Sequence, residues 1–274
     1  MNDLHFCPVT NTHTGFPEKK SVVVTFVWQE LNPREQRTLQ QGVDVLGRHP
    51  FVVLHPESFN IEALKKEYGN VIFLALPDKH FHSIDAYNEM LLSTWFYDIF
   101  AEYEYMLIYQ TDAYVFSDQL NYWTSMGFDY IGAPWMLNDN VYQRYLGQWV
   151  KRLLKCLPIH HHHVHSAHLF HQVGNGGFSL RRIPKMREIM EKNKALIKSV
   201  SGKHARQEDV MISILLKEKE NLKIPSWRLA IYFSWEKSPA QCLELTGGVF
   251  PFGCHDTNGK YWERFWKYYI PLEE

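Results

Sequence analysis

Four short, strongly apolar segments alternate with helical patterns in the first 110 residues of this 274-residue chain. The first, residues 21–28, reads SVVVTFVW and has the β-branched and aromatic composition of a buried strand. The stretches between these segments have the caps and apolar spacing of helices. We therefore predict further strands at 51–55, 71–76 and 105–110, and helices at about 33–46, 60–69 and 83–102.

This alternation predicts an α/β fold with a mostly parallel, Rossmann-like central sheet and helices on both faces, whose ligands bind beyond the carboxyl ends of the strands. Beyond residue 130 the pattern is less regular. No Pro-, Gly- or Ser-rich linker divides the chain, so we predict one domain over 1–274 with two functional halves, about 21–137 and 138–274. In the second half we expect strands at 130–133, 172–180 and 229–235, and helices at 141–154, 183–199 and 208–220.

The formal net charge of -1 conceals two halves of opposite charge. Residues 1–137 contain 8 Lys and Arg against 17 Asp and Glu, whereas residues 138–274 contain 21 against 13. The near-neutral total gives no general attraction to nucleic acid or to an anionic membrane. An acidic half beside a basic half suits a cleft for a cation and a phosphorylated ligand, and it equally suits two solvated surfaces.

The cysteines and the N-terminal residues indicate a cytoplasmic protein. The four cysteines form no C-x-x-C pair, as expected for reduced thiols. No basic segment followed by an apolar one begins the sequence, and the longest apolar runs have the length of strands. We expect no integral membrane segment, and any membrane contact to be peripheral, at the inner face.

Two motifs follow or form predicted strands. Asp112 comes directly after the apolar segment 105–110, where a carboxylate could bind Mg²⁺ or Mn²⁺ together with diphosphate oxygens, or could merely cap the turn. Residues 174–181 read GNGGFSLR, and paired glycines allow a backbone to approach a ligand closely. Asn175 offers donors and an acceptor to sugar hydroxyls, although the same motif also suits a bulged strand or a hairpin turn.

Two further motifs lie in the basic half. Glu208 and Asp209 open a predicted helix, where one carboxylate could act as a general base or could simply favour the helix dipole. His255 lies beside Gly253 near the end of the chain, where an imidazole could bind metal or phosphate or could be an ordinary, partly buried histidine.

Taken together and in this order, the motifs resemble those of GT-A-type glycosyltransferases. More narrowly, the sequence resembles a bacterial GT-A-like family long catalogued as a domain of unknown function and presumed to transfer sugars. The resemblance covers roughly residues 21–270. It is most specific in two segments, Gly-Ala-Pro-Trp at 132–135 and the Asn-Gly-Gly-Phe-Ser-Leu-Arg of 175–181.

The resemblance implies a site for a nucleotide-diphosphate sugar, with UDP as the expected nucleotide, and for Mn²⁺ or Mg²⁺. GT-A enzymes usually carry an Asp-x-Asp motif, but here its first position is Gln110, which leaves Asp112 and His255 as the expected metal ligands. The acidic half would bind the nucleotide sugar, and the basic half would receive the diphosphate and the acceptor. The implied donor-binding residues are Trp28, Lys79, Asn88, Gln110, Asp112, Trp135, Asn175, Gly176 and Gly177.

The Glu-Asp pair resembles the acidic motif of inverting transferases. This implies that Asp209 deprotonates a hydroxyl of a glycan or lipid-linked glycan acceptor and that its neighbour Glu208 binds the acceptor. Two rival functions stay open. A sugar nucleotidyltransferase would need a Gly- and Lys/Arg-rich loop after the first strand, where this chain has Trp28 and residues 29–31. A non-catalytic glycan- or nucleotide-sugar-binding protein of the same fold would be consistent with Gln110.

A histidine-rich tract at 160–171 contains 7 of the 15 histidines. It lacks the fixed spacing of a structural zinc site and has no nearby pair of cysteines. We expect a loop near the acceptor entrance, and gripping of an anionic acceptor is the alternative role.

Overall fold

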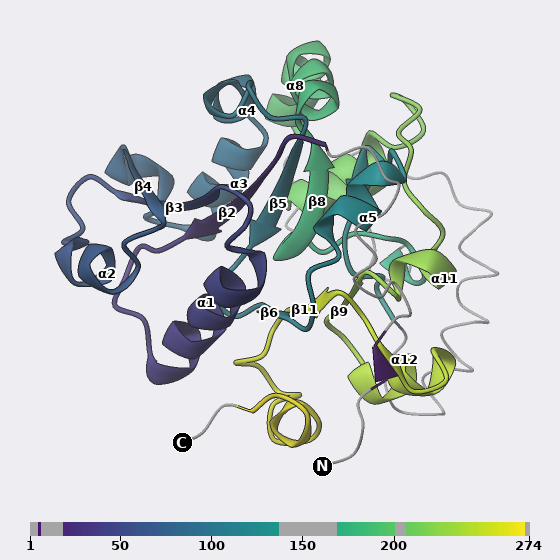
Figure 1. The fold of residues 1–274 in the computed structure, drawn as a ribbon. Helices are drawn as coiled ribbons and strands as arrows, with labels where there is room; N and C mark the ends of the chain where they lie inside the picture. Colours follow the sequence, from purple (N-terminus) through teal and green to yellow (C-terminus); the bar gives the residue numbers. More distant parts are fainter. Residues whose placement is uncertain (1–4, 7–18, 137–168, 201–206, 272–274) are drawn as a thin grey trace.

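The computed structural model describes residues 5–6, 19–136, 169–200 and 207–271. Its core is a six-stranded sheet with the order β4-β3-β2-β5-β8-β7 (Figure 1). Four neighbouring strands are parallel, namely β4 (Ile72–Leu76), β3 (Phe51–Pro56), β2 (Ser21–Phe26) and β5 (Tyr105–Tyr109). Strand β8 (Phe178–Arg182) runs antiparallel to β5 and to β7 (Tyr130–Ile131). The predicted mostly parallel α/β sheet is confirmed.

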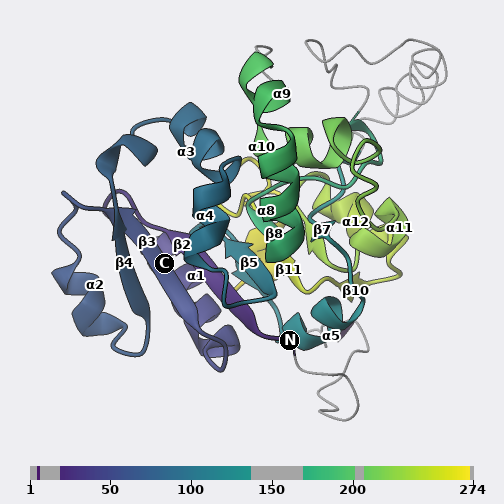
Figure 2. The same ribbon diagram turned by 90° about the horizontal axis from the view of Figure 1, so that it is seen from above.

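Alternate residues of the strands build two separate cores. Val22 and Val24 of β2 belong to a cluster with residues of α3 (Ile84–Leu91), α4 (Thr94–Ile99) and α8 (Ile183–Lys192). Helices α4 and α8 lie side by side over this face (Figures 1 and 2). Val23 faces the other way and packs with residues of α1 (Pro33–Leu46) and α5 (Leu120–Ser125). Both faces of the sheet are therefore covered, as the run of buried residues in β2 requires.

Local capping explains where the first helices begin. Asn32 Oδ1 accepts hydrogen bonds from the backbone N–H groups of Arg34 and Glu35, and Glu35 returns a carboxylate to the Asn32 N–H. This capping box, with Pro33 at the first helical position, confirms the start predicted for α1. The N–H of Glu62 donates to Asn60 Oδ1 just before α2 (Glu62–Glu67).

Several predicted elements are shorter than expected. The helix predicted at 83–102 is divided because Ser93 caps a new helix by accepting from the Phe96 N–H. The helix predicted at 183–199 is likewise interrupted at Asn193, before α9 (Lys194–Ser199). The helix predicted at 208–220 consists of α10 (Glu208–Val210) and a π-helix, Met211–Leu215.

The strand predicted at 229–235 is wrong in its first half. Helix α11 occupies Trp227–Ala230, and only Ser234–Trp235 forms a strand, β9. The strand predicted at 172–180 begins only at Phe178. The helix predicted at 141–154 lies outside the described residues, as does most of the histidine tract.

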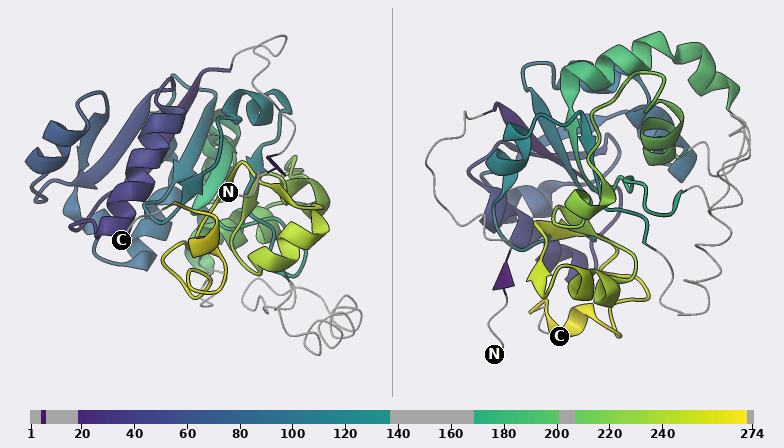
Figure 3. Two further views of the ribbon diagram at one scale, coloured as in Figure 1. Left: turned by 60° about the horizontal axis from the view of Figure 1, so that its bottom comes forward. Right: turned by 90° about the vertical axis from the view of Figure 1, so that its right-hand side faces the viewer.

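The C-terminal part adds a small second sheet beyond the carboxyl end of β5. Its order is β6-β11-β9, with β6 at Tyr114–Val115 and β11 at Gly253–Cys254. It is accompanied by α12 (Pro239–Leu245) and an aromatic C-terminal segment (Figure 3). A two-residue strand, β1 (His5–Phe6), pairs with β10 (Val249–Phe250). Because β6 continues from β5 and pairs with β11, this sheet brings His255 back to the end of β5.

None of the helices within the described ranges combines the length and the hydropathy of a membrane span.

Candidate functional site

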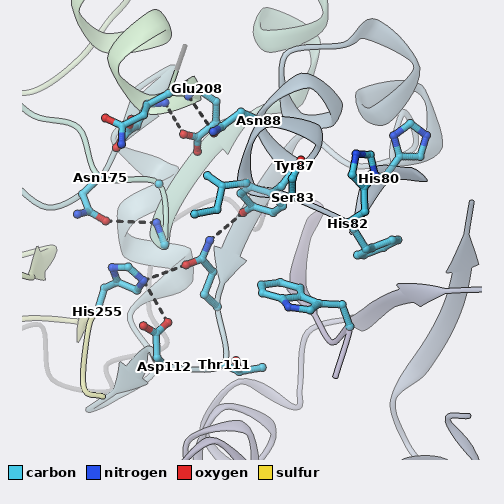
Figure 4. Close-up of a pocket in the computed structure, with 18 of the residues that line it drawn as sticks. His80, His82, Ser83, Tyr87, Asn88, Thr111, Asp112, Asn175, Glu208 and His255 are labelled. Atoms are coloured by element: carbon cyan, nitrogen blue, oxygen red, sulfur yellow. Dashed lines mark hydrogen bonds and ion pairs between the residues drawn. The ribbon is translucent and has the colours of Figure 1, made fainter. Parts of the chain in front are cut away.

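A cavity of about 600 Å³ opens at the carboxyl ends of β2 and β5. Its walls come from Glu35 of α1 and from six further segments spread along the sequence (Figure 4). Trp28 follows β2, residues 80–88 lead into α3, residues 110–112 follow β5, residues 175–177 precede β8, residues 207–209 open α10, and His255 follows β11. This is the place where parallel α/β sheets bind ligands.

Three side chains converge at the end of β5. His255 Nε2 lies 2.9 Å from Gln110 Oε1 and 3.1 Å from Asp112 Oδ1. The amide nitrogen of Gln110 donates a hydrogen bond of 2.9 Å to the Tyr87 hydroxyl. Both ends of the Gln110 amide therefore bind protein groups, and its oxygen faces the imidazole.

Asp112 and His255 form a partly buried ion pair. Burial alone would raise the pKa of Asp112, but the charge and the hydrogen bond of His255 hold that pKa below its ordinary value. Burial lowers the pKa of His255, but Asp112 outweighs it and raises the pKa to about 9. The imidazole is thus protonated at neutral pH in the absence of another cation.

The donor set fits a divalent cation only in part. Asp112 and His255 bring a carboxylate oxygen and an imidazole nitrogen to one point, beside the amide oxygen of Gln110. His255 Nδ1 is buried without a hydrogen-bond partner. The described residues contain no group of three or more His, Cys, Asp or Glu side chains that could hold a metal ion. A cation here would need oxygen atoms from a ligand to complete its coordination.

Gly176 and Gly177 separate two acidic walls of the cavity. A Cβ atom on Gly177 would overlap the ring of His255, and one on Gly176 would overlap Oε1 of Glu208. Asn175, just before them, has a left-handed backbone with a φ of 55°, and its side-chain oxygen accepts from the Gly177 N–H. Its amide nitrogen donates to Glu236. The glycines are therefore needed for close approach of protein side chains.

Both carboxylate oxygens of Glu208 and its backbone N–H form hydrogen bonds within the protein. Its Oε1 lies 2.5 Å from a guanidinium nitrogen of Arg181, and its Oε2 accepts from the backbone N–H of Asp209. Its own N–H donates to the Asn88 side-chain oxygen at 3.2 Å. With both oxygens engaged, Glu208 is poorly placed to accept a proton from a ligand.

Asp209 differs from its neighbour. It lines the cavity, and its Oδ1 accepts a local hydrogen bond from the Val210 N–H. Burial and the adjacent charge of Glu208 raise the pKa of Asp209 to about 7. A carboxyl group that gains and loses its proton near neutral pH suits general acid–base chemistry.

The structure brings together most of the residues that the sequence singled out. Lys79 and Trp135 do not line the cavity: Lys79 lies on an exposed 3-10 turn, and Trp135 is buried against Gly174. The residues of the prediction that line it are Trp28, Asn88, Gln110, Asp112, Asn175, Gly176, Gly177, Glu208, Asp209 and His255.

Sequence reasoning missed one whole wall and one buried cation. The wall comes from residues 80–87, among which His80, His82 and Tyr87 contribute aromatic rings. The signals in the sequence are their position after a predicted strand and the inclusion of Phe81 and Tyr87 in the resemblance to the GT-A-like family. The cation is Arg181. It is the last residue of the motif at 174–181, but the motif does not indicate that this residue has a role in the site.

The charge of the cavity differs from the expected division into an acidic and a basic half. Its described lining contains four carboxylates, Glu35, Asp112, Glu208 and Asp209, and no lysine or arginine. The basic half instead contributes two of these carboxylates. A diphosphate entering this part of the cavity would meet negative charge unless a cation accompanied it.

We expect Gly176→Ala to lower the free energy of unfolding by about 1–3 kcal/mol, because the new Cβ must displace Glu208 from its buried position. Gly69→Ala is the matched control, since a Cβ there meets no atom within 4 Å. Urea denaturation of both variants measures the difference. A Gly176→Ala protein as stable as the control would contradict the packing described here.

Asp209→Asn should stabilise the protein at pH 8. A folded pKa of about 7, above the unfolded value of 3.8, gives stability that is present below pH 3.8 and is lost as the pH rises through 7. The asparagine variant escapes this loss. The difference of about three between these pKa values sets a gain of up to about 4 kcal/mol at pH 8, with little difference expected below pH 4, measured by denaturation at both pH values. Equal stability at pH 8 would show that the carboxyl group is not desolvated.

Among solved structures, the chain is similar to the galactosyltransferase LgtC, crystallised in complex with donor and acceptor sugar analogues. The TM-score is 0.50 at 13% sequence identity, over 90% of this chain and 94% of that chain. At this identity the likeness shows the fold, and it confirms the expected GT-A-like architecture. No match is found among curated proteins. The model of the family described as "Protein of unknown function (DUF5672)" matches residues 70–255, more than half of the chain. The chain therefore belongs to the DUF5672 family.

Proposed function

We propose that this protein is a glycosyltransferase that moves a sugar from a nucleotide-diphosphate donor to a hydroxyl group of a glycan or lipid-linked glycan. One observation carries the proposal. A single cavity in a GT-A-like fold has Asp112 and His255 on one wall and Asp209 on the other, with Gly176 and Gly177 between them. The similar galactosyltransferase LgtC was crystallised with donor and acceptor sugar analogues, which supports the same class of reaction.

The donor would lie along the wall formed by residues 28 and 80–88. Trp28 is 43% exposed, and its ring lies 6.5 Å from that of Tyr87, so both can contact a base. Uridine-linked sugars are the first donors to test. A divalent cation, Mn²⁺ or Mg²⁺, held by Asp112 and His255 would neutralise the diphosphate as it leaves. The acidic lining supports this requirement, because its described residues supply no lysine or arginine for the phosphates.

The acceptor hydroxyl would approach Asp209. The Asp209 carboxylate takes the proton of the hydroxyl group while the hydroxyl oxygen forms a bond to the anomeric carbon of the donor. The bond between that carbon and the diphosphate oxygen breaks, and the nucleoside diphosphate leaves with the electron pair. A single displacement of this kind inverts the anomeric configuration.

The proposal also includes the location of the protein. A lipid-linked acceptor, such as the precursor of a bacterial surface glycan, would bring a cytoplasmic protein to the inner face of the membrane.

A non-catalytic role in binding nucleotide sugars is the rival function, and it predicts binding without consumption of the donor. The fixed orientation of Gln110 between Tyr87 and His255 is compatible with both functions.

A thermal-shift panel of nucleotide sugars tests donor binding. With Mn²⁺ and saturating donor we expect the unfolding midpoint to rise by roughly 5 °C, since a ligand at 100 times its Kd adds about 2.7 kcal/mol. Asp112→Asn should abolish most of this shift, whereas Asp44→Asn, on the exposed face of α1, should retain it. The absence of a shift with every nucleotide sugar, with and without Mn²⁺, would refute the proposed function.

The pH dependence of sugar transfer tests the base. Because Asp209 must be deprotonated to act, kcat/KM should rise with pH and level off above about 7. Asp209→Asn should lower kcat by roughly 10²–10⁴-fold and leave the donor-induced thermal shift unchanged. Unaltered transfer by this variant would exclude Asp209 as the base, and donor binding without any turnover by the wild-type protein would favour the non-catalytic function.

A further inference from the structure

Arg181 is the cation at the centre of the site, although it does not line the cavity. Its side chain is fully buried. Besides the ion pair with Glu208, its Nε donates to Ser179 Oγ at 3.2 Å and another nitrogen donates to the Tyr97 hydroxyl at 3.4 Å. The guanidinium also lies 5.6 Å from the centre of the Tyr130 ring. These four partners, from separate parts of the chain, hold one orientation of the guanidinium.

The same network reaches the backbone of the glycine pair. Ser179 Oγ, which accepts from Arg181, donates to the carbonyl oxygen of Gly176 at 2.8 Å. Glu208 lies in the space that the missing side chain of Gly176 leaves open, 4% exposed. Its second oxygen then accepts from the Asp209 N–H. An unbroken chain of polar contacts therefore runs from Arg181 to the backbone of the proposed base.

Stability alone does not explain such a pair. Two charges removed from water lose hydration that their mutual attraction regains only with good geometry, and apolar residues of similar volume often serve as well. What the pair supplies is a fixed negative charge next to Asp209. We propose that Arg181 is the positioning residue of this site: it holds the Glu208 carboxylate above Gly176, and that carboxylate fixes the place of Asp209 through its backbone N–H.

The effect of Arg181 on catalysis rests on the proposed function. Its effect on the position and ionisation of Asp209 does not. Within the part of the chain that the structure describes, the charged groups that act on Asp209 are Glu208, Glu236 and Arg181, and Asp209 lies in the field of the Tyr130 hydroxyl. Glu208 and Glu236 favour the protonated carboxyl group, and Arg181 opposes them. Because Glu208 acts more strongly than Arg181, removing both charges together should let Asp209 lose its proton at lower pH.

The test compares the wild-type protein with the double variant Arg181→Met, Glu208→Gln. Both substitutions nearly keep the volume and leave no unpaired charge, so the variant should fold. Arg182→Met is the matched control: Arg182 is the next residue of β8, is 41% exposed and pairs with Glu104 at 3.4 Å. In the double variant we expect kcat to fall at least about 30-fold and the donor KM to change less than about threefold. The midpoint of the pH–rate profile should move about one pH unit lower, and the control should match the wild type.

A second readout needs no activity. The stabilisation produced by Asp209→Asn at pH 8 is measured in the wild-type and in the double-variant background. It should shrink in the double variant, because Asp209 there ionises at lower cost. An equal gain in both backgrounds, or a folded double variant with the wild-type pH profile and kcat, would overturn the role of Arg181. If the wild type consumes no nucleotide sugar, only the proposed function fails, and the stability comparison still decides about Arg181.

Discussion

The geometry of this site depends on the close approach of two side chains to the backbone of two glycines. Glu208 and His255 occupy the positions where Cβ atoms of Gly176 and Gly177 would otherwise lie. The carbonyl oxygen of Gly177 also accepts a hydrogen bond from the Gln110 N–H, which ties the glycine pair to the end of β5. The glycine backbone therefore lies directly between the Glu208 side chain on one wall and the His255 side chain on the other. Any larger residue would move either the carboxylate or the imidazole.

This spacing creates an electrostatic contrast within one cavity. On one side His255 keeps the pKa of Asp112 low despite burial, and on the other side burial and Glu208 raise the pKa of Asp209 to about 7. Asp112 and Asp209 therefore lose their protons at different pH values, although they line one cavity. Two carboxyl groups with pKa values so far apart can take different parts in acid–base chemistry.

Much of the fold could be predicted because its determinants are local. The apolar runs of β2, β3 and β5 and the capping box at Asn32 are each made of residues that lie within a few positions of one another, and each of these elements lies where it is expected. The segment 229–235 is misjudged from sequence because a short apolar run can form a buried helix or a strand, and its periodicity does not decide between them. The break at Ser93 depends on one hydroxyl group that caps a new helix.

The candidate site was predictable where motifs follow strands and unpredictable where contacts link distant segments. Gln110 and Asp112 line the cavity because β5 ends just before them. The partner of Arg181 lies 27 residues further along the chain, and that of His255 lies 145 residues earlier, at Gln110. Such pairs arise from the tertiary fold alone.

The most direct test of sugar transfer is a proton NMR experiment on the anomeric signal during incubation with nucleotide sugars and Mn²⁺. We expect one donor to be consumed and the first product to have the inverted configuration, with product formed at least roughly 10²-fold more slowly by Asp209→Asn. Failure to consume any nucleotide sugar would contradict sugar transfer by this protein, and a product with retained configuration would contradict the single displacement with Asp209 as base.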